Sequence, residues 1–344
     1  MNILFDINHP AHIHLFKNAI RILEEKEHNV IITSRDKDIT IQLLDIYGLQ
    51  HIVLSRARKS LLGLACELIW RQIHLFPILL NNKINICVSV TGASNVHICK
   101  LFGIPTLVFY DTEHAKLQNR MTLPFVTNFI SPASFKESYG KKHITYNGTH
   151  DLAYLHPKYF SPNKDIYKSL NIPEDQRYII IRFVSWQAAH DVGQKGISLA
   201  LKRNIIELCK KYAKVFITSE APFDNEFEEY RFPIPPENMH NALSFATMYI
   251  GEGGSMATEA AVLGTPSILI SSLTAGVFEE YQNDYGLMYS FLPNEEDRIL
   301  ETIKELFHNE FLKQSWQEKR NRFIEDKIDI TEWMVNKILE YQKK

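Results

Sequence analysis

The sequence of 344 residues is poor in cysteine and has no marked excess of either charge. Its four cysteines form no CxxC pair, which argues against a zinc or redox motif and predicts buried free thiols in a reducing compartment. They are Cys66, Cys87, Cys99 and Cys209. The net charge of −2 argues against a general nucleic-acid-binding protein, because such proteins usually carry a strongly basic surface.

The N-terminus lacks the basic segment and short apolar run of a signal peptide, so we expect a cytoplasmic protein. One apolar run, Leu61–Leu80, is long enough to raise the question of a membrane. It holds Glu67 and Arg71 near its middle, where charge would be costly in hydrocarbon. The run therefore predicts a helix buried in a domain. The alternative is a helix that rests on a membrane surface, so we expect at most peripheral membrane contact.

Low-complexity tracts and short-period repeats are also missing, and the contents of 45% hydrophobic and 23% charged residues are ordinary for a globular protein. At about 100–200 residues per domain, the length predicts two domains. In the first half, strands alternate with segments of helical periodicity, which predicts a parallel sheet covered by helices. The predicted strands are 2–8, 30–33, 52–54, 84–90, 106–109 and 128–131, and the helices are 11–26, 36–47, 61–80 and 93–102.

Residues 147–177 interrupt this alternation with prolines, asparagines and lysines, which is typical of a hinge. A second series follows, with strands 178–183, 214–218, 248–250 and 267–269, helices 197–212, 237–245 and 255–263, and three closing helices at 295–308, 310–327 and 331–342. We expect domains at 1–150 and 151–325, and a final helix at 326–344 that can pack back on the first domain. Ligands of such sheets bind at the carboxyl ends of strands, so the cleft between two doubly wound domains is the expected site.

A glycine-rich turn joins a strand to a helix in the second half, at Gly251-Glu252-Gly253-Gly254-Ser255. Glycines let a backbone approach a ligand closely, and a helix start presents free N–H groups and a positive dipole end. The turn thus predicts a diphosphate site, with tight packing of the turn as the alternative. Glu259, four residues along the same helical face, is within reach of a ribose.

This segment resembles a known signature. Residues 251–266, with the turn, Glu259-Ala and Gly264-Thr-Pro266, are similar to the donor site of GT-B proteins. That group includes the glycosyltransferase that makes lipid II and the UDP-N-acetylglucosamine 2-epimerases. The resemblance implies two Rossmann-like domains, diphosphate contacts from Gly253, Gly254 and Ser255, and a ribose contact from Glu259. The whole chain also resembles the DUF354 family, most specifically at 6–18, and that family carries no settled activity.

A histidine turn, His9-Pro10-Ala11-His12-Ile13-His14, follows the first strand. Inverting GT-B transferases often have a base histidine at this place, so by analogy His12 or His9 takes a proton from an acceptor hydroxyl. Histidine suits this work because its pKa lies near neutrality. The alternatives are that His12 caps the helix and that His14 packs on a face. A metal site is disfavoured, since His12 and His14 face different ways on a helix.

A second cluster, Asp111, Glu113 and His114, follows the strand that ends at Phe109. These groups are candidates for acid–base work or sugar binding, with a solvated loop as the alternative. The region resembles an epimerase stretch in which a Gly-Asp-Thr turn precedes a Val-Glu-Ala segment. Glu113 matches the glutamate, but the aspartate is missing, because this chain reads Thr91-Gly92-Ala93-Ser94. We still expect Gly92 to contact the substrate.

Arg182, at the end of the first strand of the second half, is placed to pair with phosphate. Trp186 is a candidate for stacking on the base or sugar, and His190 for lining the cleft. The epimerase Arg-Glu-Asn signature is absent here as well. A surface arginine and plain loops at the sheet edge are the alternatives.

We therefore expect a metal-independent glycosyltransferase that uses no cofactor and moves a sugar from a nucleotide diphosphate-sugar, UDP-linked by resemblance, to a glycan or lipid-linked acceptor in polysaccharide biosynthesis. Glu252 to Ser255, Arg182 and Glu259 are the donor-binding candidates. His12, His9, Glu113 and Asp111 are the catalytic candidates. The first alternative is a sugar-nucleotide 2-epimerase or hydrolase. The second is a non-catalytic protein that binds nucleotide-sugars.

Overall fold

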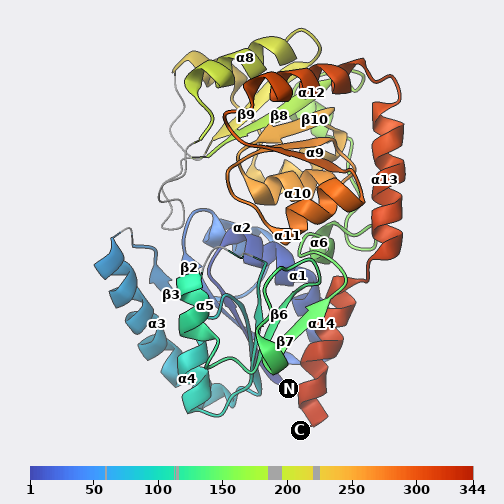
Figure 1. The fold of residues 1–344 in the computed structure, drawn as a ribbon. Coiled ribbons are helices and arrows are strands. Elements are labelled where there is room, and N and C mark those ends of the chain that lie inside the picture. The colour runs from blue at the N-terminus through green and yellow to red at the C-terminus, as the bar shows by residue number, and fades with distance from the viewer. Residues whose placement is uncertain (59, 112, 114–115, 185–195, 220–224, 344) are drawn as a thin grey trace. The chain divides into compact units, whose positions relative to one another are not determined.

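The computed structural model describes residues 1–58, 60–111, 113, 116–184, 196–219 and 225–343. The chain forms two compact units (Figure 1). Unit 1 consists of residues 1–159 and 328–344, and unit 2 of residues 160–327. Each unit has one parallel sheet packed with helices, as the alternation of strands and helices predicts.

Unit 1 contains a seven-stranded sheet in the order β3-β2-β1-β4-β5-β6-β7. The chain runs outward from β1 to β3 and then returns to β4 on the other side of β1, which puts the topological switch point between β1 and β4. The elements are β1 Asn2–Ile7, α1 Pro10–Glu25, β2 Asn29–Asp36, α2 Thr40–Ile46, β3 Ile52–Arg56, α3 Leu61–Asn82, β4 Ile86–Val90, α4 Val96–Leu101, β5 Thr106–Phe109, α5 Lys116–Thr122, β6 Asn128–Pro132, β7 His143–Tyr146, α6 Leu152–Leu155 and α14 Ile330–Leu339.

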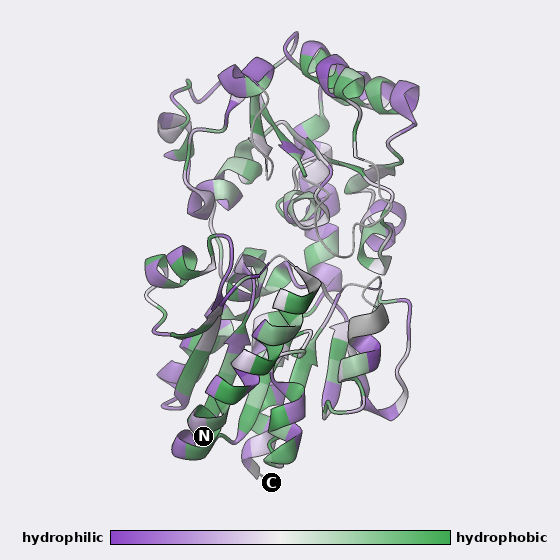
Figure 2. Cartoon of the chain, turned by 90° about the vertical axis from the view of Figure 1, so that its left-hand side faces the viewer, coloured by the Kyte–Doolittle hydropathy of each residue, from purple (hydrophilic) through white to green (hydrophobic). Residues whose placement is uncertain are grey.

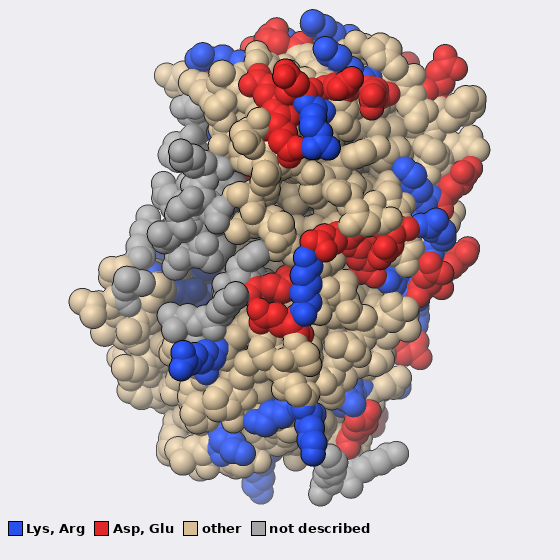
Figure 3. Space-filling view, in the orientation of Figure 1, with Lys and Arg blue, Asp and Glu red and all other residues tan. Residues whose placement is uncertain are grey.

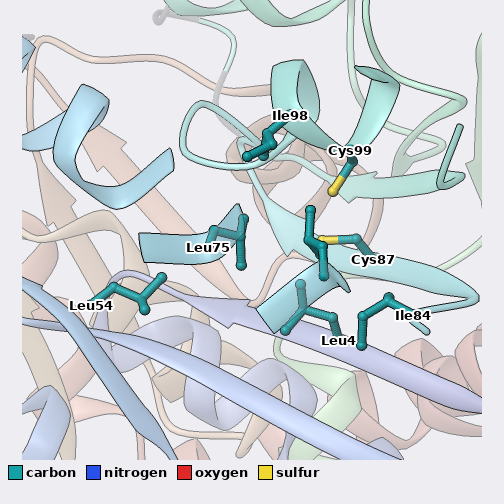
Figure 4. Packing of buried hydrophobic residues seen from close by; sticks show 8 residues of the cluster. Leu4, Leu54, Leu75, Ile84, Cys87, Ile98 and Cys99 are labelled. Atoms are coloured by element: carbon teal, nitrogen blue, oxygen red, sulfur yellow. The ribbon is translucent and has the colours of Figure 1, made fainter. Parts of the chain in front are cut away.

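The core of unit 1 includes a cluster that joins α3 and α4 to the sheet (Figure 4). Leu75 and Leu79 of α3 pack with Leu4 of β1 and with Cys87 and Cys99. Both of these cysteines are fully buried free thiols, and Cys209 is buried too. Cys66 is exposed, so the expectation of buried thiols is wrong for that one residue.

Helix α3 is only partly buried, and the expectation of a buried domain helix is wrong for its outer side. Its two charged residues face inward: Glu67 and Arg71 are 4% and 2% exposed. Its large apolar residues on the other side, among them Leu62 and Ile73, are 82% and 60% exposed. Figure 2 shows this apolar helix across the front of unit 1. By length and composition α3 is the one helix among the described residues that could cross a membrane.

Helix α14 is the last regular α-helix of the chain, and it packs within unit 1 against α1 and α6. Thr331 donates a hydrogen bond to the carbonyl of Ala153 at 2.7 Å. Asp329 caps the helix and accepts bonds from Lys158 and Tyr159. Ile330 packs against Gly148, where a Cβ would lie 2.5 Å from Cδ1 of the isoleucine.

Unit 2 contains a five-stranded sheet in the order β12-β11-β10-β8-β9. Its switch point lies between β8 and β10, because β9 is on one side of β8 and β10 to β12 are on the other. The elements are α7 Ile166–Ser169, β8 Tyr178–Phe183, α8 Leu199–Cys209, β9 Lys214–Ser219, α9 Met239–Phe245, β10 Met248–Gly251, α10 Gly254–Val262, β11 Ser267–Ile270, α11 Gly276–Glu279, β12 Met288–Phe291, α12 Glu296–His308 and α13 Leu312–Asp326.

Two strands escaped sequence reasoning, β7 at His143–Tyr146 and β12 at Met288–Phe291. Each is four residues long and is the last strand at one edge of its sheet. A short edge strand is half exposed, so its residues alternate weakly and look like loop. The remaining predicted strands form, with ends shifted by a few residues.

Candidate functional site

The glycine-rich turn of unit 2 lies at the switch point, where β10 ends and α10 begins. Helix α10 starts at Gly254, and no side chain caps its first turn. The N–H groups at the start of a helix have no partner within it, and the dipole adds positive potential there. Ser255 is exposed at this end. The turn is therefore suited to an anion such as a phosphate group.

Packing within the protein already accounts for two of the glycines. A Cβ on Gly254 would lie 2.5 Å from Cζ of Phe278. A Cβ on Gly251 would lie 2.5 Å from the hydroxyl of Tyr249 and 2.8 Å from the carbonyl oxygen of Arg182. Tight packing of the turn is thus a fact, and the case for a phosphate rests on the helix start instead of on the number of glycines.

Arg182 adds a positive charge beside the same turn. It sits at the end of β8, in register with Gly251 of β10. Its Nη1 donates to Oγ1 of Thr218 at 3.1 Å, and a Cβ on Gly253 would lie 3.3 Å from its Nε. Because the two strands are neighbours across the switch point, the sheet brings the arginine and the turn together as the sequence predicts.

Glu252 is buried, and its carboxylate binds backbone N–H groups of a neighbouring segment. Its carboxylate accepts hydrogen bonds from the N–H of Val184 at 2.9 Å and from that of Ile197 at 2.6 Å. These amides flank the stretch 185–195, so Glu252 ties together the two ends of the β8–α8 connection. Trp186 and His190 lie in that stretch, outside the described residues.

Glu259 is oriented by a histidine that sequence reasoning missed. Its Oε1 lies 3.1 Å from Nε2 of His240, and both side chains are largely buried. His240 is the second residue of α9, and its ring meets the edge of Phe160. A single histidine in a short helix carries no motif, so only the packing of α9 on α10 reveals the pair.

In unit 1 the switch point is built around the carboxylate of Asp6, which is fully buried at the end of β1. Arg71 of α3 forms an ion pair with it at 2.6 Å. Ser94, Asn95 and Thr33 donate hydrogen bonds to its two oxygens. Burial alone would raise the pKa of Asp6, but the Arg71 charge and these hydrogen bonds hold the pKa below its usual value. Asp6 is therefore a fixed anion that joins β1, α3 and the β4–α4 loop.

His12 follows this network and is a neutral group. Its Nδ1 accepts a hydrogen bond from the backbone N–H of Asn8 at 3.2 Å, so the ring proton is on Nε2. Burial, reinforced by neighbouring His9, lowers the pKa of His12 to about 3. Such an imidazole donates a hydrogen bond from Nε2 but is a poor base at neutral pH.

His9, and not His12, caps α1, because its Nδ1 accepts from the N–H of Ala11 at 3.2 Å. Pro10 occupies the first helical position, where a missing N–H costs nothing. His14 points elsewhere, since its ring stacks on Tyr154 at 5.2 Å between centroids. The three histidines of the turn therefore have three different surroundings.

The ionisable pair that sequence reasoning missed is Asp111 with His150. Oδ2 of Asp111 lies 3.0 Å from Nδ1 of His150, and the histidine side chain is 12% exposed. Nε2 of His150 is buried and makes no hydrogen bond among the described residues. His150 and Asp111 are also close enough to His12 to affect its ionisation. A carboxylate that fixes the imidazole and leaves the far nitrogen unpaired is the arrangement of a general base.

The surroundings of the other candidates in unit 1 indicate a role in packing or in holding the backbone. Glu113 is 9% exposed and accepts from the N–H of Lys136 at 3.4 Å. Gly92 has φ +70°, and a Cβ there would lie 2.6 Å from Cγ1 of Val96, so only glycine fits. Thr91, the residue before it, also has positive φ, at 65°, which is strained for a threonine. His114 lies outside the described residues.

Two parallel α/β units, each with polar groups at its switch point, define the GT-B fold class, and the solved structures agree. UDP-GlcNAc 2-epimerase from Neisseria meningitidis, bound to UDP-GlcNAc, gives a TM-score of 0.71 at 12% identity, covering 99% of this chain and 100% of that one. The S. aureus MnaA structure with UDP gives 0.71 at 11% identity, covering 100% and 97%. The spinosyn rhamnosyltransferase SpnG with thymidine diphosphate gives 0.63 at 13% identity, covering 99% and 100%. The predicted fold class is confirmed.

The chain belongs to the DUF354 family, described as "Protein of unknown function (DUF354)", whose model matches residues 1–343. A relative in Methanocaldococcus jannaschii, "Uncharacterized protein MJ0665", is 26% identical over 281 residues, which is 78% of this chain and 81% of the relative. The resemblance stated from the sequence is confirmed.

Proposed function

We propose that this protein is a glycosyltransferase that takes a nucleotide diphosphate-sugar as donor and needs no metal ion. Unit 2 binds the donor. The observation that carries the proposal is the joint position of the uncapped start of α10 and the Arg182 guanidinium at the β8–β10 switch point. Together they supply N–H donors and a full positive charge to a leaving diphosphate, which is the stabilisation that sugar transfer requires.

Glu259 supplies the second part of the donor site. The His240 contact holds its carboxylate in place, and a carboxylate accepts hydrogen bonds from ribose hydroxyls. Gly253 and Ser255 bring the backbone to the diphosphate. Glu252 acts indirectly, by fixing the ends of the β8–α8 connection. The binding of UDP and thymidine diphosphate by proteins of the same fold supports a nucleotide ligand.

Unit 1 supplies the proton transfer. His150, fixed by Asp111, accepts the proton of the acceptor hydroxyl at Nε2 while that oxygen attacks the sugar carbon and the diphosphate leaves. His12 donates a hydrogen bond from Nε2 and does not take the proton, because its pKa is too low. This assigns the base to the Asp111–His150 pair in place of His12 or His9.

The alternative is epimerisation at C2 of a UDP-sugar, which the neighbouring epimerase structures favour. It requires carboxylates that take up and return a proton. The carboxylate that accepts hydrogen bonds from the β4–α4 loop is Asp6, and Arg71 with four hydrogen-bonding groups fixes it as a buried anion. Asp6 is therefore unavailable for proton exchange with a substrate, which leaves Asp111 and Glu113 as the carboxylates that epimerisation would use.

Donor binding is tested by calorimetry after a thermal-shift panel of nucleotide diphosphate-sugars has selected the tightest ligand. Glu259→Ala should weaken that ligand by about tenfold, as expected for the loss of hydrogen bonds to a charged group. Glu207→Ala is the control, because Glu207 is an exposed carboxylate on another helix of unit 2 that pairs with Lys210. Equal affinity in both variants would contradict the placement of the ribose at Glu259.

The reaction is tested by incubating UDP-N-acetylglucosamine with the protein alone. Conversion at C2 without an acceptor would identify an epimerase. A transferase leaves the sugar unconverted and turns over only with an acceptor, in the presence of EDTA as well as in its absence. Binding without turnover under any acceptor, unchanged in His150→Gln, would instead identify a non-catalytic binding protein.

A further inference from the structure

Helix α3 buries its charged residues and exposes its large apolar residues, which is the reverse of a helix on a water-exposed surface. Six large apolar side chains, exposed by 44% to 82%, form what is called here the α3 apolar face: Leu62, Ile69, Trp70, Ile73, Phe76 and Leu80. At about 100° per residue they cover an arc of roughly 120°. In Figure 3 the left edge of unit 1 is mainly tan, with basic but no acidic side chains close to it.

The two charged residues of α3 form their bonds inside unit 1. Glu67 accepts hydrogen bonds from Arg35 at 2.6 Å and from Ser55 at 2.8 Å. Arg71 pairs with Asp6 and donates to the carbonyl of Ser34. These bonds, with Leu75 and Leu79 in the core, fix α3 on the sheet, so the helix cannot leave it to span a membrane. The apolar arc stays outward.

The charged residues of the segment that carries the face are mostly basic, although Arg56 pairs with Asp36 of β2 at 3.4 Å. Between Asp45 and Asp111 the sequence holds one acidic residue, Glu67, which is buried. The same stretch holds Arg56, Arg58, Lys59, Lys83 and Lys100 in addition to the buried Arg71. Arg56 and Arg58 precede the helix, Lys83 follows it, and Lys100 lies on α4. Basic residues at both ends of an apolar helix match a surface that is apolar within and anionic at its rim.

The apolar surface also extends to α4. Leu101 is 80% exposed, and a groove of about 390 Å³ lies between the two helices. The lining residues are Ile69, Gln72, Ile73 and Phe76 from α3 and Ile98 from α4, so the groove is mainly apolar. A second helix would cover only a narrow seam along α3, whereas a fluid apolar phase fills both the broad arc and the groove.

We propose that the α3 apolar face docks unit 1 on a lipid bilayer containing anionic lipid, with α3 parallel to the surface. Trp70 lies at the edge of the apolar arc, at the depth where tryptophan is favoured in membranes. The occupant is the bilayer itself, and the basic residues at the ends of α3 contact its headgroups. This docking does not depend on the identity of any sugar substrate.

Flotation of the full chain with vesicles tests the proposal, using phosphatidylcholine alone and an equimolar mixture with phosphatidylglycerol. The protein should float with the mixed vesicles and bind less tightly at high salt. Ile69→Gln/Ile73→Gln/Phe76→Gln should reduce binding by more than about tenfold, since the buried apolar area sets the affinity. Lys83→Gln/Lys100→Gln should reduce it by about tenfold for the mixed vesicles only.

The matched control is Leu199→Gln/Leu292→Gln/Phe311→Gln, three exposed apolar residues of unit 2, which should leave binding unchanged. Circular dichroism melting shows that each variant is folded. A readout without any apolar substitution comes from Cys66, which is exposed on α3 while the other three cysteines are buried. An environment-sensitive dye on Cys66 should brighten with mixed vesicles.

Three results would overturn the proposal. The first is no flotation of the wild-type chain with either vesicle. The second is flotation that the α3 triple variant retains. The third is a dimer in sedimentation that the triple variant dissociates, without vesicle binding, because a second copy of the chain would then cover the face.

Discussion

The two switch points of this protein differ in the groups that they present: side chains in unit 1 and mainly backbone in unit 2. In unit 1, the end of β1 is surrounded by ionisable side chains, with Asp6 paired to Arg71 and Asp111 to His150. In unit 2, the turn after β10 offers mainly backbone, with one arginine beside it. In the proposed function, the same topology thus gives one site that moves a proton and another that holds an anion. The side chains after each strand, and not the sheet, make the difference.

The largest effect that sharpens this comparison is expected at His150. His150→Gln should lower kcat by about 10²–10⁴-fold, the usual contribution of a general base. Nucleotide affinity by calorimetry should stay within about twofold, because the proposed donor site lies in unit 2. Asp111→Asn should lower kcat less, since the imidazole remains. A full rate in His150→Gln, with loss of rate in His12→Gln, would return the base to His12.

The next effect concerns stability. Asp6→Asn leaves Arg71 buried without its counter-charge and should lower the free energy of unfolding by about 3–5 kcal/mol. Urea denaturation measures it. Asp38→Asn is the control, because that carboxylate is exposed at 3.6 Å from Lys37 and should cost less than about 1 kcal/mol. Equal losses in the two variants would show that the Asp6 network is no more than a surface pair.

At the switch point of unit 2, Gly254→Ala tests why position 254 is a glycine: for packing against Phe278 or for close approach of a ligand. The new methyl would meet the ring of Phe278 and should cost about 1–3 kcal/mol of stability. Phe278→Ala in the same chain removes the clash. If nucleotide affinity returns in the double variant, Gly254 is needed for packing alone. If stability returns but affinity does not, the ligand itself requires the bare backbone.

The last effect is a pH dependence at His12. Its pKa is about 3 in the folded chain against 6.5 for the free side chain, so between these values the unfolded state binds the extra proton. The stability from His12 is therefore complete above pH 6.5 and is lost as the pH falls toward 3, by at most about 1.4 kcal/mol per pH unit. His12→Gln should flatten the fall in melting temperature between pH 7 and 5. An unchanged slope would mean that His12 is not kept neutral by its surroundings.

Local patterns predicted most of the fold. Apolar runs of strand length followed by helical periodicity indicated β1, β4, β5, β8 and β10, because a buried parallel strand is apolar on both faces. The helix start after Gly253 and the position of Arg182 were also predicted, since both depend on where a strand ends. The short edge strands β7 and β12 were not, because half-exposed residues carry little periodicity.

Sequence by itself determined which residues end the strands, and hence that the histidine turn, the Asp111 loop and the glycine turn lie at carboxyl ends of sheets. Tertiary structure alone decided their partners. The pairs Asp111–His150, Glu259–His240 and Asp6–Arg71 join residues that are distant along the chain. The tertiary structure also decided that α3 turns its charges inward and its apolar residues outward. Arg71 and Glu67 of that helix are held inward because they bond to the buried carboxylate of Asp6 and to the guanidinium of Arg35.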